Sequence, residues 1–370
     1  MDKSNTFGSI PMLGFGAMRF PCFEDGSVDI EKVKVMIDEF MQAGFCYFDT
    51  AYYYHGVKSE GVLNEALVKR YPRESFLIAD KMPLTIIKEQ ADYLPTFNAQ
   101  LERTGVEYFD FYLLHNLTRE QIALTEQRGG FEFIKQMKQE GRVKHIGFST
   151  HDNADALEAL LARHPEVEFV QLQVNYLDWN NDMVQSRKCC EVARKYNKPI
   201  IVMEPVRGGT LANLPEDARA LLDTVDKEAS SASFALRYAA SIDGVFMVLS
   251  GMSTLEQVRD NVRCFSELKE ITDEEIKLLE RVKEMVARTM LIPCTSCRYC
   301  TDGCPKHINI PAFFSGVNQT KLDPLADWRS IYAEALGDGG APSDCIACGK
   351  CKKSCPQNID IVHQLMFIRL

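Results

Sequence analysis

The feature that most constrains this chain is a long alternation between segments with helical and with strand-like spacing of apolar residues. Apolar positions recur at helical intervals over residues 29–44, 61–70, 94–103, 131–139, 154–163, 185–196, 231–240 and 254–265. Short runs rich in branched and aromatic residues lie between them, for example at 144–149, 169–175, 200–204 and 245–250. Counted from Cys46, the pattern gives eight strands interleaved with helices, which predicts a parallel sheet closed into a (β/α)8 TIM barrel. The segment at 10–16 alternates and carries glycines, which predicts a strand or hairpin that opens the barrel.

Polar residues stand at the ends of three predicted strands. One apolar run ends at Asp49, ahead of three consecutive tyrosines at 52–54, and two further runs end in Lys81 and His115. The carboxyl ends of barrel strands meet at the face where barrel enzymes hold their catalytic residues. We therefore expect an aspartate, a tyrosine, a lysine and a histidine to form one proton-transfer set.

The order and spacing of these residues resemble those of the aldo-keto reductases, which are nicotinamide-dependent carbonyl reductases on a (β/α)8 barrel. The family's Asp-x-Ala-x-x-Tyr motif falls on Asp49, Ala51 and Tyr54, its lysine on Lys81 and its histidine on His115. Each residue alone has an ordinary explanation, since a lysine at a strand end is usually solvated and a single histidine is usually structural. The four in order, each after its own apolar strand, favour the catalytic interpretation.

The resemblance implies reduction of an aldehyde or ketone by NADPH or NADH, or the reverse oxidation of an alcohol. Hydride transfer to a carbonyl carbon leaves negative charge on oxygen, and the proton that this oxygen needs would come from Tyr54. A free tyrosine has a pKa of about 10, and a neighbouring ammonium such as that of Lys81 would lower it. Asp49 would hold the lysine, and His115 would hydrogen-bond the carbonyl oxygen and orient the substrate.

The resemblance also implies a cofactor site along the later strand ends. Hydroxyl and amide side chains there would hydrogen-bond the nicotinamide carboxamide, and of two glutamines on one strand the family alignment favours Gln173. Many family members carry an aromatic residue at the position of Met203, whose polarisable side chain would pack on the ring. The expected cofactor residues are Gly16, Ser149, Thr150, Gln173, Met203, Val206, Gly251, Ser253, Gln257 and Asn261.

The last predicted strand ends in a glycine-containing turn at 250–254 that opens a helix. Backbone N–H groups at such a turn can bind phosphate, and barrels often bind phosphate near this strand. The alternative is a Ser/Thr helix cap without a ligand. NADPH-preferring relatives usually carry Lys or Arg at the positions of Gly251 and Gln257, whereas Arg259 and Arg263 lie one helix face away. NADPH and NADH therefore both remain open.

Eight of the 13 cysteines form two runs of the type C-x2-C-x2-C-x3-C-P near the C-terminus. Each run matches the bacterial ferredoxin pattern for a [4Fe–4S] cluster, and in two-cluster proteins the fourth cysteine of a run ligates the other cluster. The runs therefore predict two clusters with exchanged ligands. One would be held by Cys294, Cys297, Cys300 and Cys355, and the other by Cys345, Cys348, Cys351 and Cys304.

Zinc and disulfides are the competing interpretations of these cysteines. Zinc sites seldom use a third closely spaced cysteine and a trailing Cys-Pro, and disulfides do not suit an intracellular chain. Between the runs, a helix is expected to start at Ile310, and an amphipathic helix is expected between Leu325 and Leu336. This arrangement resembles the α-helical two-cluster ferredoxin modules that pass electrons in multi-subunit reductases.

These features divide the chain into a barrel at 1–271, a linking helix at 272–290 and a two-cluster domain at 291–370. The linking helix begins with a capping box at 272–275 and carries an apolar stripe. The architecture is thus α/β, a TIM barrel followed by a small, mainly α-helical ferredoxin-like domain.

Charge and composition limit the partners. The net charge is −10 without a basic run, which argues against nucleic acid. Residues 1–11 lack the apolar core of a signal peptide, and no apolar stretch reaches the roughly 18 residues of a membrane span. We expect a cytoplasmic protein that acts on a small carbonyl or alcohol substrate.

Three functions fit these features. The first is a carbonyl reductase whose clusters are structural or sense redox state. The second is an electron-transfer protein that couples nicotinamide to a redox protein partner at the ferredoxin-type domain, and the third is a nicotinamide-binding redox sensor. Nicotinamide transfers two electrons as hydride whereas a [4Fe–4S] cluster transfers one, and no flavin-binding motif is evident to convert between them. The intact tetrad favours the first.

Overall fold

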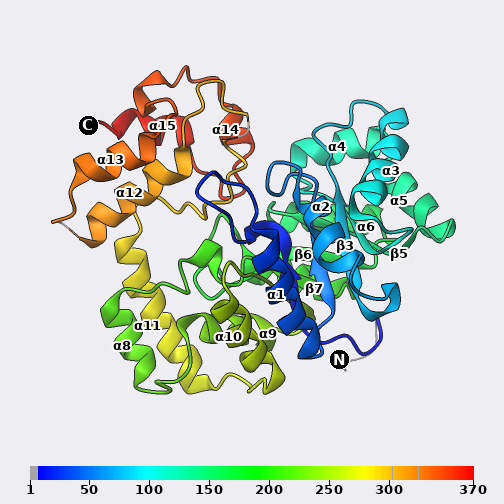
Figure 1. Ribbon diagram of the computed structural model, residues 1–370, viewed down its shortest axis with the longest axis horizontal. Coiled ribbons are helices and arrows are strands. Elements are labelled where there is room, and N and C mark those ends of the chain that lie inside the picture. Colours follow the sequence, from blue (N-terminus) through cyan, green and yellow to red (C-terminus); the bar gives the residue numbers. More distant parts are fainter. Residues whose placement is uncertain (1–6, 302, 324) are drawn as a thin grey trace. The chain divides into compact units, whose positions relative to one another are not determined.

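The computed structural model describes residues 7–301, 303–323 and 325–370 (Figure 1). Eight parallel strands close into a barrel in chain order, and β1 is hydrogen-bonded to both β2 and β8. The strands are β1 (Leu13–Gly16), β2 (Tyr47–Asp49), β3 (Leu77–Met82), β4 (Phe109–Leu114), β5 (Val143–Thr150), β6 (Phe169–Gln173), β7 (Ile200–Met203) and β8 (Val245–Gly251). The predicted TIM barrel is confirmed. Residues 1–6, which belong to the predicted barrel domain and to the segment considered as a signal peptide, lie outside the described residues.

The strand count from Cys46 is wrong in its starting point. Only β2 to β8 follow that residue, and the remaining strand is β1, formed by the glycine-containing segment ahead of it. Gly14 lies where a Cβ atom would come within 2.6 Å of the Leu249 side chain and 3.0 Å of the Tyr47 ring. Glycine at this position therefore lets the short first strand pair closely with β2 and β8.

Large side chains fill the interior of the barrel. Tyr47, Phe111, Phe169 and Met247 come from different strands, and all are at most 1% exposed. Gly147 on β5 leaves room for this packing, because a Cβ atom there would lie 2.6 Å from the ring of Phe169. The barrel interior is thus a packed core, and polar groups are confined to the strand ends and a few interior positions.

Helices follow most of the strands. They are α1 (Ile30–Gln42), α2 (Ser59–Leu63), α3 (Tyr93–Thr104), α4 (Arg119–Gln127), α5 (Gly130–Gln139), α6 (Ala154–Arg163), α7 (Ser186–Lys195), α8 (Glu216–Asp223), α9 (Ser231–Ser241) and α10 (Leu255–Ser266). The helix expected at 61–70 is instead α2 followed by a π-helical segment, Asn64–Val68. Of the helices from α1 to α10, α4 and α8 were not predicted, and α4 is mostly polar with only Ile122 and Thr125 buried.

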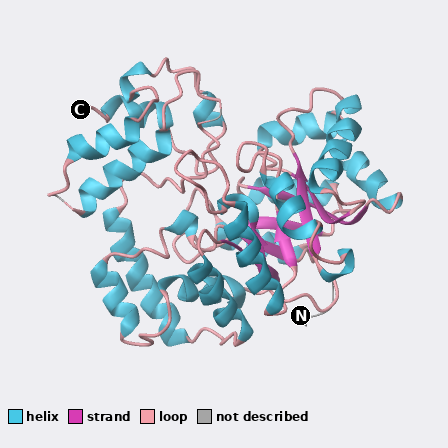
Figure 2. Cartoon of the chain, viewed as in Figure 1, coloured by secondary structure: helices cyan, strands magenta, loops and turns pink. Residues whose placement is uncertain are grey.

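By contacts, the chain forms two compact units. One comprises the residues up to Pro205 together with Ser233–Ile271, and the other comprises Val206–Ala232 together with Thr272–Leu370. All eight strands belong to the first unit, and the described part of the second contains helices and loops (Figure 2). The grouping of Val206–Ala232 with the C-terminal residues was not expected from the sequence. The predicted domain boundaries at 271 and 290 stay a prediction.

The second unit is built from α8, α11 (Asp273–Thr289), α12 (Ile310–Leu322), α13 (Trp328–Leu336), α14 (Lys350–Lys353) and α15 (Ile361–Phe367). The capping box of α11 is present, with the Thr272 hydroxyl and the Glu275 carboxylate each accepting from the other residue's backbone N–H at 3.2 and 2.8 Å. Apolar residues of α12 and α15 contribute to a core that includes two of the motif cysteines, Cys300 and Cys351. Four others pack against this core, namely Cys294, Cys304, Cys345 and Cys355. In the described residues, no helix is long and apolar enough to cross a membrane.

Candidate functional site

Asp49 and Lys81 meet at the ends of adjacent strands. Asp49 is the last residue of β2, Lys81 lies near the end of β3, and the Lys81 Nζ atom is 2.5 Å from Asp49 Oδ1. The lysine side chain is 1% exposed and the aspartate side chain 4%, so the pair is shielded from water. The ammonium also donates to the backbone oxygen of Thr50 at 2.7 Å. A buried charge needs such partners, and this lysine has them.

The same ammonium reaches Tyr54. Lys81 Nζ lies 3.4 Å from the Tyr54 hydroxyl and 5.0 Å from the centroid of its ring. The two neighbouring tyrosines have other contacts, because the Tyr53 hydroxyl bonds to Thr85 and the Arg103 guanidinium lies over the Tyr52 ring at 5.1 Å. Of the three consecutive tyrosines, the one that meets Lys81 is therefore the one selected by the motif.

His115 follows β4 and faces the tyrosines. Its ring lies 6.2 Å from that of Tyr54 at an interplanar angle of 86°, and 5.9 Å from that of Tyr53. Burial, together with the positive charge of Lys81, holds the pKa of His115 well below its ordinary value. The imidazole is consequently neutral near neutral pH. The structure thus brings together all four residues of the predicted tetrad.

Gln171 is a residue of this site that the sequence interpretation did not select. Its side chain on β6 is 2% exposed and donates from Nε2 to Asp49 Oδ2 at 3.4 Å. Burial raises the pKa of Asp49, and the Lys81 ammonium and the Gln171 amide oppose that rise. The signal was present in the two glutamines at period two on β6, which point to the same side of the strand.

Gln173, the favoured glutamine, belongs to a separate polar network. Its Nε2 donates to Asp178 Oδ2 at 2.8 Å, and its Oε1 lies 3.3 Å from Nδ1 of His151. Asn175 also donates to Asp178 Oδ2, at 3.0 Å, and to the backbone oxygen of Glu204 at 3.1 Å. Burial lowers the pKa of His151 to about 4, so this imidazole too is neutral. The network fixes both ends of the Gln173 amide.

The hydroxyls of Ser149 and Thr150 are engaged with the loop that follows β4. Ser149 Oγ accepts from the Asn116 backbone N–H at 2.8 Å, and Thr150 Oγ1 donates to the Leu117 backbone oxygen at 2.6 Å. Both residues are nearly buried at the end of β5. They hold the His115 loop against β5.

The ends of β1 and β8 lie side by side. Gly16 pairs with both Asp49 and Gly251, so it lies between the end of β2, which carries Asp49, and the end of β8. A Cβ atom on Gly251 would come within 3.2 Å of the Arg19 side chain. Arg19 thus packs on the glycine at which NADPH-preferring relatives carry a cation, a contact that the sequence interpretation missed.

The turn before α10 is held by its own side chains. Ser253 donates from Oγ to the Arg19 backbone oxygen at 2.8 Å and from its N–H to Gln257 Oε1 at 2.7 Å. Asn261 is buried and donates to Ser250 Oγ at 2.6 Å. Arg259 forms a bidentate pair with Glu39, which directs it away from this turn.

The remaining expected cofactor residues lie near β7. Met203 ends β7, is partly buried and pairs in register with Gln173. Val206 lies three residues further on and belongs to the other compact unit. The expected cofactor residues therefore lie at the ends of β1, β5, β6, β7 and β8 and in α10 and the turn before it, with the exception of Val206.

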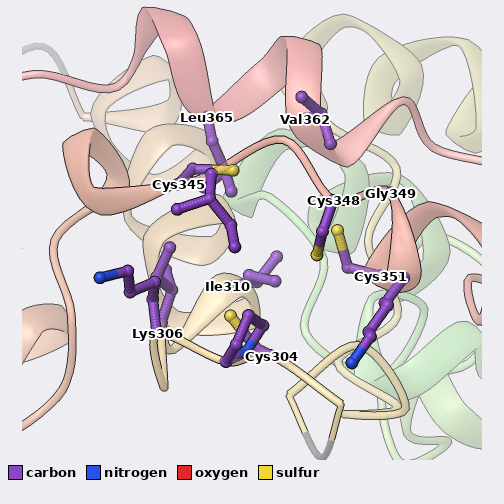
Figure 3. Close-up of a pocket in the computed structure, with 13 residues that line it drawn as sticks. Cys304, Lys306, Ile310, Cys345, Cys348, Gly349, Cys351, Val362 and Leu365 are labelled. Atoms are coloured by element: carbon purple, nitrogen blue, oxygen red, sulfur yellow. The ribbon is translucent and has the colours of Figure 1, made fainter.

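The motif cysteines line two separate cavities in the second unit. The cysteines of one cavity are Cys294, Cys297, Cys300 and Cys355. The cysteines of the other are Cys304, Cys345, Cys348 and Cys351. In Figure 3, Cys304 faces this second cavity from one side and Cys345 and Cys348 from the other. In each cavity, three cysteines of one run meet the last cysteine of the other.

The donor set of each cavity fits a [4Fe–4S] cluster. Four thiolates around such a cluster leave a net negative charge, and cationic side chains line both cavities, namely Arg298 in one and Lys306 and Lys350 in the other. In the part of the chain that the structure describes, no three histidine, cysteine or carboxylate side chains close around a single ion.

Comparisons with known proteins divide the chain in the same order. Residues 12–284 match the aldo/keto reductase family, and residues 293–359 match the 4Fe-4S dicluster domain. An uncharacterized oxidoreductase of Schizosaccharomyces pombe is 28% identical over 265 residues, covering 68% of this chain and 80% of that protein. The NADH-specific methylglyoxal reductase of Escherichia coli is 22% identical over 297 residues, covering 69% of this chain and 89% of that protein.

A solved structure supports the fold. The aldo/keto reductase from Klebsiella pneumoniae in complex with NADP and acetate is 18% identical and superposes with a TM-score of 0.61. The match covers 75% of this chain and 92% of that chain. At this identity the likeness shows the barrel architecture alone.

Proposed function

Because the chain belongs to the aldo/keto reductase family, whose members are NAD(P)-dependent oxidoreductases, we propose that it reduces an aldehyde or ketone, or oxidises the corresponding alcohol, with Tyr54 as the proton donor. The observation that carries this proposal is the position of one buried ammonium between a carboxylate and a phenol. Lys81 Nζ lies 2.5 Å from Asp49 Oδ1 and 3.4 Å from the Tyr54 hydroxyl.

The tetrad geometry assigns a role to each residue. A bound nicotinamide would supply a hydride to the carbonyl carbon. Lys81 stabilises the phenolate of Tyr54 electrostatically, which makes the phenol a better acid when the carbonyl oxygen gains negative charge. Asp49, held by Gln171, fixes the position of the ammonium. Neutral His115 can donate a hydrogen bond to the same carbonyl oxygen without competing for the proton.

The cofactor would lie along the strand ends that border this tetrad. We assign the nicotinamide end to Gly16, Ser149, Thr150, Gln173 and Met203, and the phosphate end to Gly251, Ser253, Gln257 and Asn261. Val206 is retained as a cofactor contact from the resemblance alone. Relatives use different nicotinamides, since one is an NADH-specific reductase and another was solved with NADP. Both cofactors are therefore included in the test.

The cysteine cavities support two [4Fe–4S] clusters with exchanged ligands. The first would be bound by Cys294, Cys297, Cys300 and Cys355, which line one cavity. The second would be bound by Cys345, Cys348, Cys351 and Cys304, which line the other. The crossed arrangement is the one found in two-cluster ferredoxins.

Carbonyl-dependent oxidation of the cofactor tests the proposal. Iron-loaded protein is incubated under anaerobic conditions with NADPH or NADH and a panel of aldehydes and ketones, and the alcohol formed is quantified. We expect one alcohol for each reduced nicotinamide consumed, with the visible iron–sulfur absorbance unchanged. If no carbonyl compound of the panel caused the protein to consume reduced nicotinamide, the result would contradict the proposal.

A second candidate function is electron transfer between nicotinamide and a redox protein partner. It is favoured by the surface position of the second cysteine cavity, where Cys348 is exposed and the adjacent Ile346 is 58% exposed. In the same experiment this function would appear as loss of the iron–sulfur absorbance on addition of nicotinamide, without any carbonyl compound. Lasting absorbance under excess NADPH and NADH, both without and with added FMN or FAD, would exclude it.

A further inference from the structure

The second unit contains a third cavity, which has no assigned role. Its volume is about 390 Å³, within the range of small-molecule sites. It is bounded by the loop at 208–215, the end of α11, the start of the first cysteine run and one side of α12. Cys294 lines both this cavity and the cavity of the first cysteine set. A molecule bound here would therefore touch a ligand of the proposed first cluster.

The walls of this cavity are held by close backbone contacts. Gly208 has a φ of 64°, and a Cβ atom at this position would lie 2.2 Å from the backbone oxygen of Thr295. Glycine is thus required where the loop meets the cysteine run. On the opposite wall, the Asn318 side chain accepts from the backbone N–H groups of Leu291 and Ile292 and donates to the Ile292 oxygen, at 2.8–3.0 Å. These contacts fix both sides of the opening relative to Cys294.

The chemistry of the lining is neutral and mixed. None of its residues carries a charge, and apolar contacts come from Val286, Met290 and Pro215. Hydroxyl and amide groups are contributed by Thr210, Ser296, Ser315 and Gln319. Within the described residues, these four side chains make no hydrogen bond, so their donors and acceptors are available to a ligand. The lining suits a flat, uncharged ring with amide-like edges.

We propose that this cavity binds the isoalloxazine ring of a flavin beside the cluster at Cys294. The ring carries carbonyl acceptors and an N–H donor on one edge and apolar methyl groups on the other, and the lining offers both amide or hydroxyl groups and apolar side chains. Because no Lys or Arg lines the cavity, the proposal concerns the uncharged ring and not a phosphate group. No sequence motif predicts this site, because its walls come from segments that span more than a hundred residues of the chain.

A flavin at this place would resolve the mismatch between two-electron and one-electron carriers. A flavin that accepted a hydride from reduced nicotinamide and a proton from water would become fully reduced. It would return to the oxidised form by giving one electron to each of two oxidised [4Fe–4S] clusters and releasing two protons. The proposal rests on the cluster assignment made above for Cys294, and its binding part is independent of carbonyl reduction in the barrel.

Flavin binding is tested by anaerobic titration of the iron-loaded, full-length protein into riboflavin, FMN or FAD, monitored by flavin fluorescence intensity and anisotropy. Ser315 is exposed on α12, and Ser315→Trp would fill the cavity. We expect this variant to raise the Kd for flavin at least tenfold. Ser330→Trp, at an exposed serine of α13 outside the lining, is the matched control and should leave the Kd unchanged.

Iron content, measured on each variant, separates loss of the site from loss of the fold. If Ser315→Trp loses iron, the truncation Gln319→Ala replaces it, and we expect it to raise the Kd about threefold to tenfold. Equal affinity for the three flavins would indicate recognition of the ring alone, and tighter FMN or FAD would add a phosphate contact outside the cavity. Absence of binding for all three flavins, or equal Kd values for the two tryptophan variants, would overturn the proposal.

Discussion

Lys81 and Asp49 form a buried ion pair at the ends of adjacent barrel strands, with Nζ 2.5 Å from Oδ1 and both side chains at most 4% exposed. Removal of one partner from such a pair leaves the other charge buried and uncompensated, which costs more than the pair contributes. Lys81 also contacts the Tyr54 hydroxyl, so we expect substitutions in this pair to affect both stability and catalysis.

A double-mutant cycle separates these consequences. We expect Lys81→Met to destabilise the barrel by roughly 3–5 kcal/mol, because it leaves the Asp49 carboxylate without its ammonium. Asp49→Asn combined with Lys81→Met should recover much of that loss. Denaturant unfolding measures the stability, and both variants should lack carbonyl reduction. Additive stability losses in the double variant would contradict the pairing.

The two glutamines of β6 should act on different kinetic quantities. Gln171 donates to Asp49 at 3.4 Å, so Gln171→Leu removes one hydrogen bond to the tetrad, which is worth about 1 kcal/mol. We expect kcat to fall about fivefold with the nicotinamide Kd unchanged. Gln173→Leu should instead raise the nicotinamide Kd. Steady-state kinetics and fluorescence titration check both, and a shared effect on one quantity would show that the assignment is wrong.

One buried histidine, His115, and one partly buried histidine, His151, predict a decline of stability at low pH. Burial lowers the pKa of His151 to about 4 and that of His115 well below its ordinary value. The unfolded chain binds protons at these side chains near pH 6.5, whereas the folded chain does not. The free energy of unfolding therefore falls as the pH decreases from about 6.5 toward 4. At neutral pH both imidazoles are mostly neutral in the folded and in the unfolded chain, so this loss of stability is absent there.

Replacement of His151 tests this dependence. We expect His151→Asn to reduce the slope of unfolding free energy against pH between pH 5 and 6.5 by up to one proton, about 1.4 kcal/mol per pH unit. His363 is exposed on α15, and His363→Asn serves as the control with an unchanged slope. Denaturant unfolding at a series of pH values provides the measurement. Equal slopes for the two variants would argue against a neutral, partly buried His151.

The exchanged cluster ligands predict a specific pattern of iron loss. Cys297 and Cys355 line one cavity although they come from different runs, whereas Cys304 lines the other. Cys297→Ala and the double variant Cys297→Ala/Cys355→Ala should both lose about four iron atoms, that is, one cluster. Cys297→Ala/Cys304→Ala should lose both clusters. The exchange would be refuted if Cys297→Ala/Cys304→Ala lost only one cluster and Cys297→Ala/Cys355→Ala lost both.

Much of this architecture followed from local patterns. Strand ends at Asp49, Lys81 and His115 were identifiable because each followed its own apolar run, and the family motif selected Tyr54 among three tyrosines. The spacing of the cysteine runs matched the ferredoxin pattern, and the exchange of the fourth cysteines between two clusters was predicted from that match. These features depend on short-range order along the chain, which the sequence displays directly.

Other features depend on contacts between distant segments. The bond from Gln171 to Asp49 joins residues 122 positions apart, and Arg19, in the short helix after β1, packs on Gly251 of β8. The π-helical segment Asn64–Val68 has only five residues, too few for the spacing of apolar residues to distinguish it from an α-helix. α4 escaped prediction because only two of its residues are buried. Register and packing decide such features, and no local motif encodes them.

The proton-donor role of Tyr54 is tested most directly by its replacement beside an adjacent control. Single-turnover carbonyl reduction is measured for Tyr54→Phe and Tyr53→Phe, with nicotinamide binding determined separately for each. Tyr53 lies near His115 and its hydroxyl bonds to Thr85, while the contact to Lys81 belongs to Tyr54. We predict that Tyr54→Phe binds nicotinamide normally and reduces the carbonyl about 10²–10⁴-fold more slowly, whereas Tyr53→Phe changes the rate only a few-fold. Full turnover by Tyr54→Phe would contradict the account.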